Sequence, residues 1–423
     1  MPHTVELIAV GTELLLGSIV NSDAQLLSRE LSALGLNVYY HTVVGDNPQR
    51  LRQAVETAKN RADILITTGG LGPTCDDLTK NVLAQAFGRE LVRDEESVRR
   101  IQDYFAQLRR PMTENNLNQA FLPEGCVIFP NDWGTAPGCA FEAQGKHVVM
   151  LPGPPSECLP MFRACAAPYL KQFSEGVIAS RILRVFGMGE SAVETLLREE
   201  MNHLTNPTLA PYAKTGEVEL RITAKADTEE EAMDLIAPVE ARVRQVLGDW
   251  IYGVDVPSLE EVVVKALLER GLSLGCAESC TGGFVSKRVT AVPGASQVFH
   301  GGVVCYTNGV KRDLLGVSGE LLERESAVSR PVAEAMALGA QKALNCDLAV
   351  AVTGVAGPGP DERGNPEGMV FVALAEQSGV RVRELHLGQG RERIRRIAAS
   401  HALDMVRRAA LGLEELDLNR KEQ

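Results

Sequence analysis

Residues Leu272–Gly283 read Leu-Ser-Leu-Gly-Cys-Ala-Glu-Ser-Cys-Thr-Gly-Gly, and this stretch decides how the C-terminal part of the chain folds. The apolar run ends at Ala277, polar residues follow, and two glycines close the segment, which is the order expected for a buried strand, a turn and a helix start. Ser279 lies in that turn. We expect its hydroxyl near a helix N-terminus, with glycine amides available to hold negative charge that develops on a substrate oxygen.

An alternation of strands and helices continues on both sides of this turn. Hydrophobic spacing predicts helices at 259–270, 331–344 and 391–408, and strands at 272–277, 302–306, 348–353 and 369–375. This alternation is typical of a sheet covered by helices. We therefore predict an α/β domain over residues 254–423.

A second alternation opens the chain. Strands are predicted at 5–10, 38–44 and 63–68, a helix at 22–34, and another helix with Pro48 in its first turn, so a doubly wound parallel sheet is expected over residues 1–170.

Residues 171–253 differ in character. Predicted strands at 181–185 and 217–224 and predicted helices at 192–201 and 228–247 come there without a Gly-rich loop. The predicted fold class is α/β, with two distinct three-layer α/β domains joined by a small α+β domain.

Bulk composition limits the classes of function. The 423 residues are 45% hydrophobic and carry a formal charge of −12, which disfavours non-specific attraction to nucleic acid or to an anionic membrane. Nine cysteines lack the paired spacing of a metal site or a disulfide framework, and no apolar stretch is long enough to span a bilayer. We expect a cytoplasmic protein with reduced, structural thiols and no membrane partner.

A serine nucleophile needs a base, and none of the seven histidines lies in a motif-like setting. Tyr306 ends a predicted strand and Lys311 follows, so both side chains could reach Ser279 across the carboxyl edge of the sheet. Lys311 can act as a base only when neutral, which requires burial or a neighbouring cation to lower its pKa. The alternatives are that Ser279 caps a helix and that Lys311 is an exposed charge.

These residues also resemble a known family. Residues 277–283, Tyr306-Thr307-Asn308 with Lys311, residues 327–329, residues 353–358 and Gly368 are similar to nicotinamide mononucleotide deamidases, the PncC family. The resemblance implies Ser279 as nucleophile, Lys311 as base, and Tyr306 and Thr353 as further catalytic residues. It implies no cofactor, and its substrate-binding set is Gly282, Gly283, Ser296, Arg391 and Arg395, the arginines contacting phosphate. Residues 389–391, Gln-Gly-Arg, depart from the family, which commonly has an acidic or amide residue after the glycine.

The N-terminal part has its own candidate site. Residues 67–74, Thr-Thr-Gly-Gly-Leu-Gly-Pro-Thr, follow a predicted strand, and Asp76 and Asp77 open the next predicted helix. Glycine amides at a helix N-terminus suit phosphate, whereas carboxylates there suit a divalent metal that bridges protein and phosphate. A plain turn and helix cap is the alternative.

Residues 11–17, 69–79, 131–138 and 151–155 together resemble the molybdopterin-binding fold of the MoaB and MoeA group, and more narrowly the CinA family. The resemblance implies metal-dependent hydrolysis of ADP-ribose to AMP and ribose 5-phosphate, with Mg, Mn or Co as the divalent cofactor, with or without K. Asp46, Asp76 and Asp77 are the implied metal acids, and the implied nucleotide pocket comprises Thr12, Glu13, Gly69, Gly70, Gly72, Asn131, Pro152, Gly153 and Pro154. Asp23 stands where the family more often has asparagine, and its charge would weaken anion binding if it faced the pocket.

Residues 172–253 are similar to the KH-like module of CinA proteins but lack a basic G-x-x-G loop, so a spacer or dimerisation role is expected and nucleic acid is not. The prediction is a homodimeric, bifunctional enzyme of pyridine-nucleotide salvage that acts on nicotinamide mononucleotide and ADP-ribose. The alternative is an active amidase fused to a non-catalytic pterin-binding, nucleotide-binding or competence-related scaffold.

Overall fold

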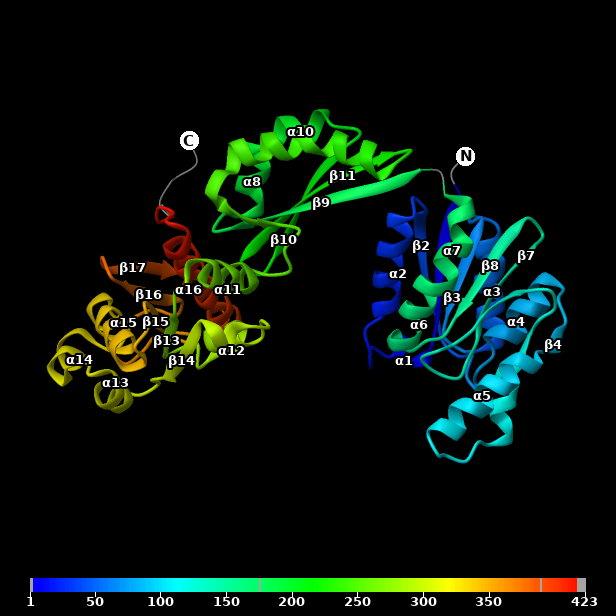
Figure 1. Ribbon diagram of the computed structural model, residues 1–423, viewed down its shortest axis with the longest axis horizontal. Coiled ribbons are helices and arrows are strands. Elements are labelled where there is room, and N and C mark those ends of the chain that lie inside the picture. Colours follow the sequence, from blue (N-terminus) through cyan, green and yellow to red (C-terminus); the bar gives the residue numbers. More distant parts are fainter. Residues whose placement is uncertain (1–2, 175, 389, 417–423) are drawn as a thin grey trace. The chain divides into compact units, whose positions relative to one another are not determined.

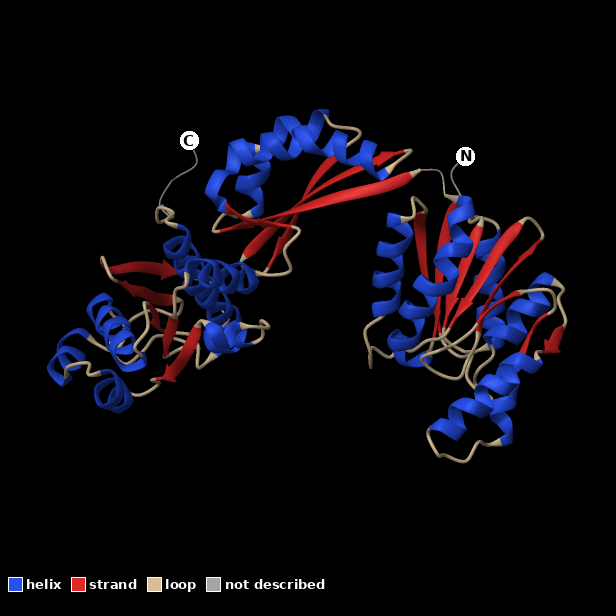
Figure 2. Cartoon of the chain, in the orientation of Figure 1, coloured by secondary structure: helices blue, strands red, loops and turns tan. Residues whose placement is uncertain are grey.

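The computed structural model describes residues 3–174, 176–388 and 390–416; Figure 1 labels those helices and strands for which there is room, and Figure 2 colours them by type. These residues form two compact units. The first runs to Ala179 and includes Ala224–Asp234, and the second comprises Ser180–Thr223 and the residues from Leu235 onward. Among the described residues, no helix combines the length and apolar character needed to cross a membrane.

The first unit is built on a six-stranded sheet in the order β2-β1-β3-β8-β7-β6. Strands β2, β1, β3 and β8 are parallel, and β7 and β6 complete the sheet in antiparallel fashion. The three strands predicted in this region are found where they were expected. The strands are β1 Thr4–Val10, β2 Asn37–Val44, β3 Ile64–Thr68, β6 Val127–Phe129, β7 Gly138–Ala143 and β8 Lys146–Leu151.

Helices cover both faces of this sheet. Successive strand residues point to opposite faces, and β3 has buried apolar residues on both, so each face needs a covering layer. Ile64 and Ile66 pack in one core with α2 and α6, whereas Leu65 packs in another with α3 and α4. The helices are α1 Thr12–Leu15, α2 Ser22–Ala33, α3 Pro48–Lys59, α4 Thr79–Phe87, α6 Pro155–Met161 and α7 Ala167–Leu170. A peripheral part holds α5 Glu95–Gln107, β4 Leu91–Arg93 and β5 Phe121–Pro123. This is the predicted three-layer arrangement.

The start of α4 differs from the prediction. The helix begins at Thr79 rather than at Asp76, and its N-terminus has no side-chain cap. The Asp77 carboxylate instead accepts hydrogen bonds from the amide and the hydroxyl of Thr74, at 2.8 and 2.6 Å. Asp77 therefore closes the preceding turn, which leaves Asp76 and Asp77 in a loop.

A four-stranded sheet in the order β10-β11-β9-β12, with three helices, lies mostly in the second unit, and only one end each of β9, β11 and α10 is counted in the first. The predicted helix at 192–201 is two short helices, and strand β10 was not predicted because its exposed residues lack a regular apolar alternation. The elements are β9 Val177–Phe186, β10 Thr208–Lys214, β11 Glu217–Ala226, β12 Ile251–Val254, α8 Glu190–Leu196, α9 Arg198–His203 and α10 Glu229–Leu247.

The rest of this unit is an α/β fold whose sheet has the order β14-β13-β15-β16-β17. Strand β13 is parallel to β14 and β15, and β16 and β17 are antiparallel additions. The strands are β13 Leu274–Glu278, β14 Phe299–Val304, β15 Leu348–Gly354, β16 Met369–Glu376 and β17 Gly379–His386. The helices are α11 Leu259–Arg270, α12 Phe284–Thr290, α13 Asn308–Leu315, α14 Gly319–Glu325, α15 Arg330–Leu344 and α16 Arg391–Leu411.

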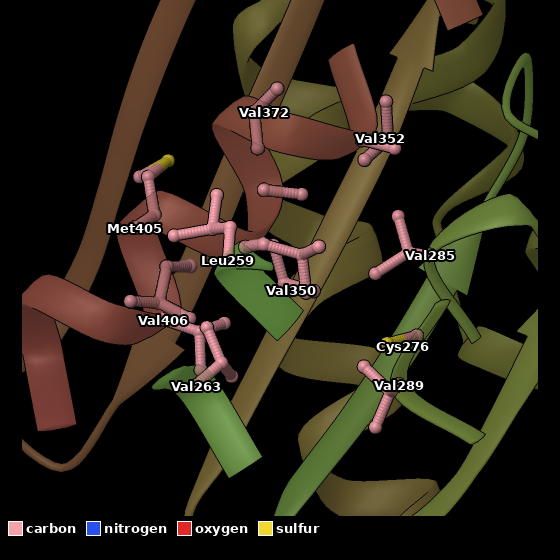
Figure 3. Packing of buried hydrophobic residues seen from close by; sticks show 14 of the residues in the cluster. Leu259, Val263, Cys276, Val285, Val289, Val350, Val352, Val372, Met405 and Val406 are labelled. Atoms are coloured by element: carbon pink, nitrogen blue, oxygen red, sulfur yellow. The ribbon is translucent and has the colours of Figure 1, made fainter. Parts of the chain in front are cut away.

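Alternate strand residues again separate two cores. Val350 and Val352 pack with Leu259, Val285 and Met405 beneath α11, α12 and α16, as Figure 3 shows. The opposite face presents alanines to α15, which allows that helix to approach the sheet closely; they are Ala277, Ala349, Ala351, Ala373 and Ala375. Cys276 lies in the first core, in agreement with a structural role for this thiol.

The small sheet and the α/β fold of the second unit share packing. Phe186 of β9 and Tyr252 of β12 belong to the same buried cluster as Leu259. Arg407 and Arg408 of α16 both donate hydrogen bonds to the carbonyl oxygen of Asp249, at 3.2 and 3.0 Å. These contacts hold the two parts of the unit together.

Candidate functional sites

The first candidate site lies at the carboxyl end of β13. Ser279 directly follows that strand, and its amide donates to the carbonyl of Val352 on β15, at 2.9 Å. Lys311 lies on α13, whose N-terminus is capped by the side chain of Thr307. Its Nζ is 3.0 Å from Ser279 Oγ and 2.7 Å from the carbonyl oxygen of Cys305. The structure thus brings together the two residues on which the sequence-based mechanism depends.

Both side chains are buried, with Ser279 8% and Lys311 1% exposed. Burial lowers the pKa of Lys311, because the charged ammonium loses its hydration, and the nearby Cys305 and Cys280 thiols oppose this only in part. A neutral amine has one lone pair and two hydrogens. The Cys305 carbonyl can accept one hydrogen while the lone pair faces the Ser279 hydroxyl, so the geometry suits a base.

Glu278 fixes the turn that carries Ser279. Its carboxylate, 1% exposed, accepts hydrogen bonds from the amides of Val285 and Ser286 and from the Ser286 hydroxyl, at 3.0, 2.8 and 2.7 Å. Helix α12 begins at Phe284, so its first-turn amides are occupied by Glu278. The expectation that a helix N-terminus lies beside Ser279 is therefore corrected, because the helix starts later and its amides serve the carboxylate.

The glycines shape this turn. Gly282 and Gly283 have φ values of 59° and 90°, which are readily adopted only by glycine, and neither lines the cavity in front of Ser279. The residue of the turn that does line it, besides Ser279, is Cys280.

Tyr306, Thr353 and Arg391 line the same cavity of about 760 Å³. Tyr306 lies after β14, which ends at Val304, and its hydroxyl accepts a hydrogen bond from Arg391 Nη2 at 3.1 Å. The Thr353 hydroxyl donates its hydrogen to the carbonyl oxygen of Ala327 at 2.7 Å, so in this arrangement it can only accept a hydrogen bond from a ligand. Arg391 is exposed at the start of α16, where an anionic group could reach its remaining N–H donors.

Two predicted substrate contacts are not in this cavity. Ser296 is exposed on the turn before β14, and because β13 and β14 are parallel it lies at the amino edge of the sheet, opposite the edge that carries Ser279. Arg395 donates to the carbonyls of Cys280 and Thr281, at 3.1 and 2.8 Å. Its donors thus hold the nucleophile turn, which corrects its assignment to phosphate.

Sequence reasoning gave no site role to seven polar residues that line the cavity, namely Asn308, Arg312, Glu323, Ser326, Asp361, Glu362 and Arg363. Arg312 directly follows Lys311 on the same helix, and this closeness to the predicted base could have marked it as a candidate residue of the site. Arg363 lies in the loop between β15 and β16, outside residues 353–358 and Gly368 that carried the resemblance. The departure noted at Gln389 lies outside the described residues.

The second candidate site is a cavity of about 610 Å³ at the carboxyl ends of β1, β3 and β8. This is where ligands bind in open α/β sheets. Nearly all residues predicted for the nucleotide site line it: Glu13, Gly69, Gly70, Gly72, Pro152, Gly153 and Pro154, with the predicted metal acids Asp46, Asp76 and Asp77. Two of the glycines, Gly69 and Gly70, have φ values of 91° and 67°.

Thr12 and Asn131 do not line this cavity but form hydrogen bonds with acids that do. The Thr12 amide donates to the Asp46 carboxylate at 2.8 Å, and the Asp46 amide donates to the Thr12 hydroxyl at 3.1 Å. Asn131 Nδ2 donates to Glu157, an unpredicted cavity residue, at 2.7 Å. Burial raises the pKa of Glu157, and the hydrogen bond from Asn131 partly offsets this. Thr12 and Asn131 thus position the acids rather than lining the cavity.

Asp23 also lines the cavity. Its side chain therefore faces the predicted nucleotide pocket, which is the case in which its charge would weaken anion binding. It is 7% exposed, and its Oδ1 has no hydrogen-bond partner. Burial raises its pKa to about 6, because water is excluded from the carboxylate and no donor replaces it.

The charges of this cavity bear on its ligand. Six carboxylate residues line it, namely Glu13, Asp23, Asp46, Asp76, Asp77 and Glu157, and none of the described lining residues is Lys, Arg or His. A diphosphate would be repelled there unless cations accompanied it. Across the residues that the structure describes, no three acids, cysteines or histidines are gathered into a ready-made metal site. Carboxylate oxygens are nevertheless the donor type that a hard divalent ion prefers, and ligand oxygens would have to complete its coordination here.

Three family models match the chain in succession. They are described as "Probable molybdopterin binding domain" over residues 6–172, "Damage-inducible protein CinA KH domain" over 180–253 and "CinA C-terminal domain" over 256–410.

Similar proteins extend over almost the whole chain. The "CinA-like protein" of Dictyoglomus turgidum is 48% identical over 408 residues, which cover 96% of this chain and 99% of that protein. The "CinA-like protein" of Kosmotoga olearia has the same identity and coverage. The crystal structure of competence/damage inducible protein CihA from Agrobacterium tumefaciens is 40% identical, covers 35% of this chain and 93% of its own, and has a TM-score of 0.34.

Proposed function

Because the chain belongs to the CinA family, we propose that its C-terminal part is a serine amidase that converts nicotinamide mononucleotide to nicotinate mononucleotide and ammonia. The observation that carries this proposal is the buried contact of 3.0 Å between Lys311 Nζ and Ser279 Oγ. A lysine desolvated beside a serine is a base within reach of a nucleophile, which is an arrangement suited to amide hydrolysis through an ester intermediate.

The first half of the reaction forms an ester. Neutral Lys311 takes the Ser279 proton while Oγ bonds to the carboxamide carbon, and the carbonyl π electrons move to oxygen. The backbone amide of Cys280, next to the nucleophile, is our candidate donor to that oxyanion. When the oxyanion collapses, the C–N bond breaks and the Lys311 ammonium protonates the leaving nitrogen, which departs as ammonia.

The second half releases the acid. Lys311, neutral again, takes a proton from water as the water oxygen bonds to the ester carbon. The bond from that carbon to Ser279 Oγ then breaks, and Oγ recovers the proton from Lys311. Arg391 supplies exposed N–H donors at the cavity, where they would bind the substrate phosphate.

An ammonia assay with separate Ser279→Ala and Lys311→Ala variants tests this proposal. Loss of the base should lower kcat by about 10²–10⁴-fold, the range typical of general base catalysis. Parental ammonia release by either variant would refute it.

We also propose that the N-terminal cavity hydrolyses ADP-ribose to AMP and ribose 5-phosphate with the help of a divalent metal, Mg, Mn or Co, with or without K. The support is the set of six carboxylates beside the glycine turn at Gly69 and Gly70. Asp46, Asp76 and Asp77 would hold the ion, which when bound would polarise the diphosphate. The glycines let the backbone approach the phosphates closely, and Thr12 keeps Asp46 in place.

AMP release from ADP-ribose, measured with each metal and with a chelator, tests the second activity. Asp76→Asn is the cleanest variant, since among the described residues its carboxylate accepts only a weak contact of 3.8 Å from Cys75 Sγ. We expect metal-dependent release that this variant lowers. No release with any of the metals would leave the alternative, an amidase fused to a binding domain.

A further inference from the structure

We propose that Glu367 is a positioning residue that holds Arg391 ready for the phosphate of the amidase substrate. This inference rests on the amidase function proposed above. Glu367 lies at the entrance to β16, between the loop that follows β15 and the strand itself. It is not among the residues that line the cavity, so any effect on the substrate must pass through its neighbours.

The Glu367 carboxylate joins two segments. Oε2 accepts a hydrogen bond from the amide of Gly359 at 2.9 Å, and Oε1 accepts one from the amide of Gly390 at 3.1 Å. Gly390 directly precedes Arg391 in the chain and is the N-cap residue of α16. One carboxylate therefore ties the loop after β15 to the backbone from which Arg391 projects.

Arg391 also links the start of α16 to the loop after β15. Its Nη1 donates to the carbonyl oxygen of Gly357 at 2.6 Å, and its Nη2 donates to the Tyr306 hydroxyl at 3.1 Å. A guanidinium has five N–H donors, so others remain for an anionic oxygen in the cavity. The Glu367 and Arg391 bonds close a ring that fixes the direction of the guanidinium.

Local chemistry explains why a carboxylate occupies this position. Gly390 cannot cap α16 with a side chain, and a negative charge near a helix N-terminus is favourable. Hydrogen bonds from Gly390 and Gly359 lower the pKa of Glu367, so the carboxylate is ionised at neutral pH. Gly357 leaves room for it, because a Cβ there would lie 2.3 Å from the Glu367 carboxyl carbon.

The expected consequence is specific to phosphate. Loss of the carboxylate frees the Gly390 amide and lets Arg391 leave its bound position, whereas other bonds hold Ser279 and Lys311, including those to Val352 and Cys305. Recognition of the phosphate should weaken while amide chemistry persists. A general structural defect would instead reduce turnover of every substrate.

The test compares nicotinamide mononucleotide with nicotinamide riboside, which lacks the phosphate. In Glu367→Ala we expect KM for the mononucleotide to rise about tenfold with kcat within about twofold, and kcat/KM for the riboside to stay unchanged. Glu367→Gln keeps one acceptor oxygen and should give an intermediate KM. Glu376→Gln is the matched control, because Glu376 lies at the far end of β16 and pairs with Arg381.

A parallel binding measurement separates this inference from the amidase proposal. Calorimetric affinities for both ligands in a Ser279→Ala background report phosphate recognition without turnover. If the unmodified protein released no ammonia, the amidase proposal would fail, yet a selective loss of mononucleotide affinity in Glu367→Ala would still support positioning. Equal losses for both ligands, or no loss for the mononucleotide, would overturn the role of Glu367.

Discussion

At the scale of single residues, the protonation of Lys311 governs the amidase. Its pKa is lowered by burial, and only the neutral amine can accept the Ser279 proton. We expect kcat/KM for nicotinamide mononucleotide to rise with pH and level off, with a midpoint below about 10.4, the ordinary value for lysine. Lys311→Arg keeps a permanent charge and should show no such rise. A profile that falls as pH rises from neutrality would contradict the role of a neutral amine.

Asp23 should make the first unit sensitive to pH. Its pKa is raised from 3.8 to about 6, so the folded state binds the proton more tightly than the unfolded state. Stability should therefore fall as pH rises between these values, and the penalty should be complete above pH 6. In metal-free protein, Asp23→Asn should stabilise the unit by on the order of 1–3 kcal/mol at pH 7.5 and by little at pH 4.

Calorimetric unfolding with a chelator at both pH values measures this difference. Equal effects of the substitution at pH 7.5 and pH 4 would show that the benefit does not come from removing a buried charge.

The sequence could predict the pairing of Ser279 with Lys311, because both follow strands whose carboxyl ends share one edge of the sheet. It could not predict the burial of Asp23. A carboxylate in the first turn of a helix is ordinarily an exposed, favourable charge, and only the folded cavity shows that this one has lost its water.

At the scale of elements, the turn between β13 and α12 depends on Glu278. Glu278→Gln would replace one acceptor oxygen with a donor facing the Val285 or Ser286 amide. We expect the second unit to lose about 1–3 kcal/mol of stability, the cost of a buried unsatisfied group, and to lose amidase activity as Ser279 shifts. Ser286→Ala removes only the hydroxyl donor and should cost less.

Thermal unfolding together with the ammonia assay measures both effects. A Glu278→Gln protein with unchanged stability would show that the three bonds to the carboxylate do not anchor the turn.

Element boundaries were the main source of error in the site. Patterns of apolar residues placed the strands but extended the 302–306 strand beyond its end at Val304, so Tyr306 was expected in a strand and lies outside it. The position of Ser296 ahead of β14 would have placed it at the wrong edge of the sheet, yet resemblance alone assigned it to the pocket. Hydrogen bonds such as those of Arg395 to Cys280 and Thr281 join residues far apart in the chain, so the spacing of residue types along the sequence does not predict them.

At the scale of the whole molecule, the two candidate sites belong to different compact units. We expect their activities to separate cleanly. Asp76→Asn should lower AMP release from ADP-ribose and leave ammonia release at the parental rate, and Ser279→Ala should do the reverse. Both products are measured in the same full-length preparations, and loss of both activities in either variant would indicate that the sites are not independent.

The most direct measurement is ammonia release from nicotinamide mononucleotide by the full chain and its Ser279→Ala variant under identical conditions. We predict metal-independent release by the parent protein and a decrease in kcat of about 10³-fold or more in the variant. Equal release by both proteins, or no release by the parent, would contradict the assignment of Ser279 and Lys311 as nucleophile and base.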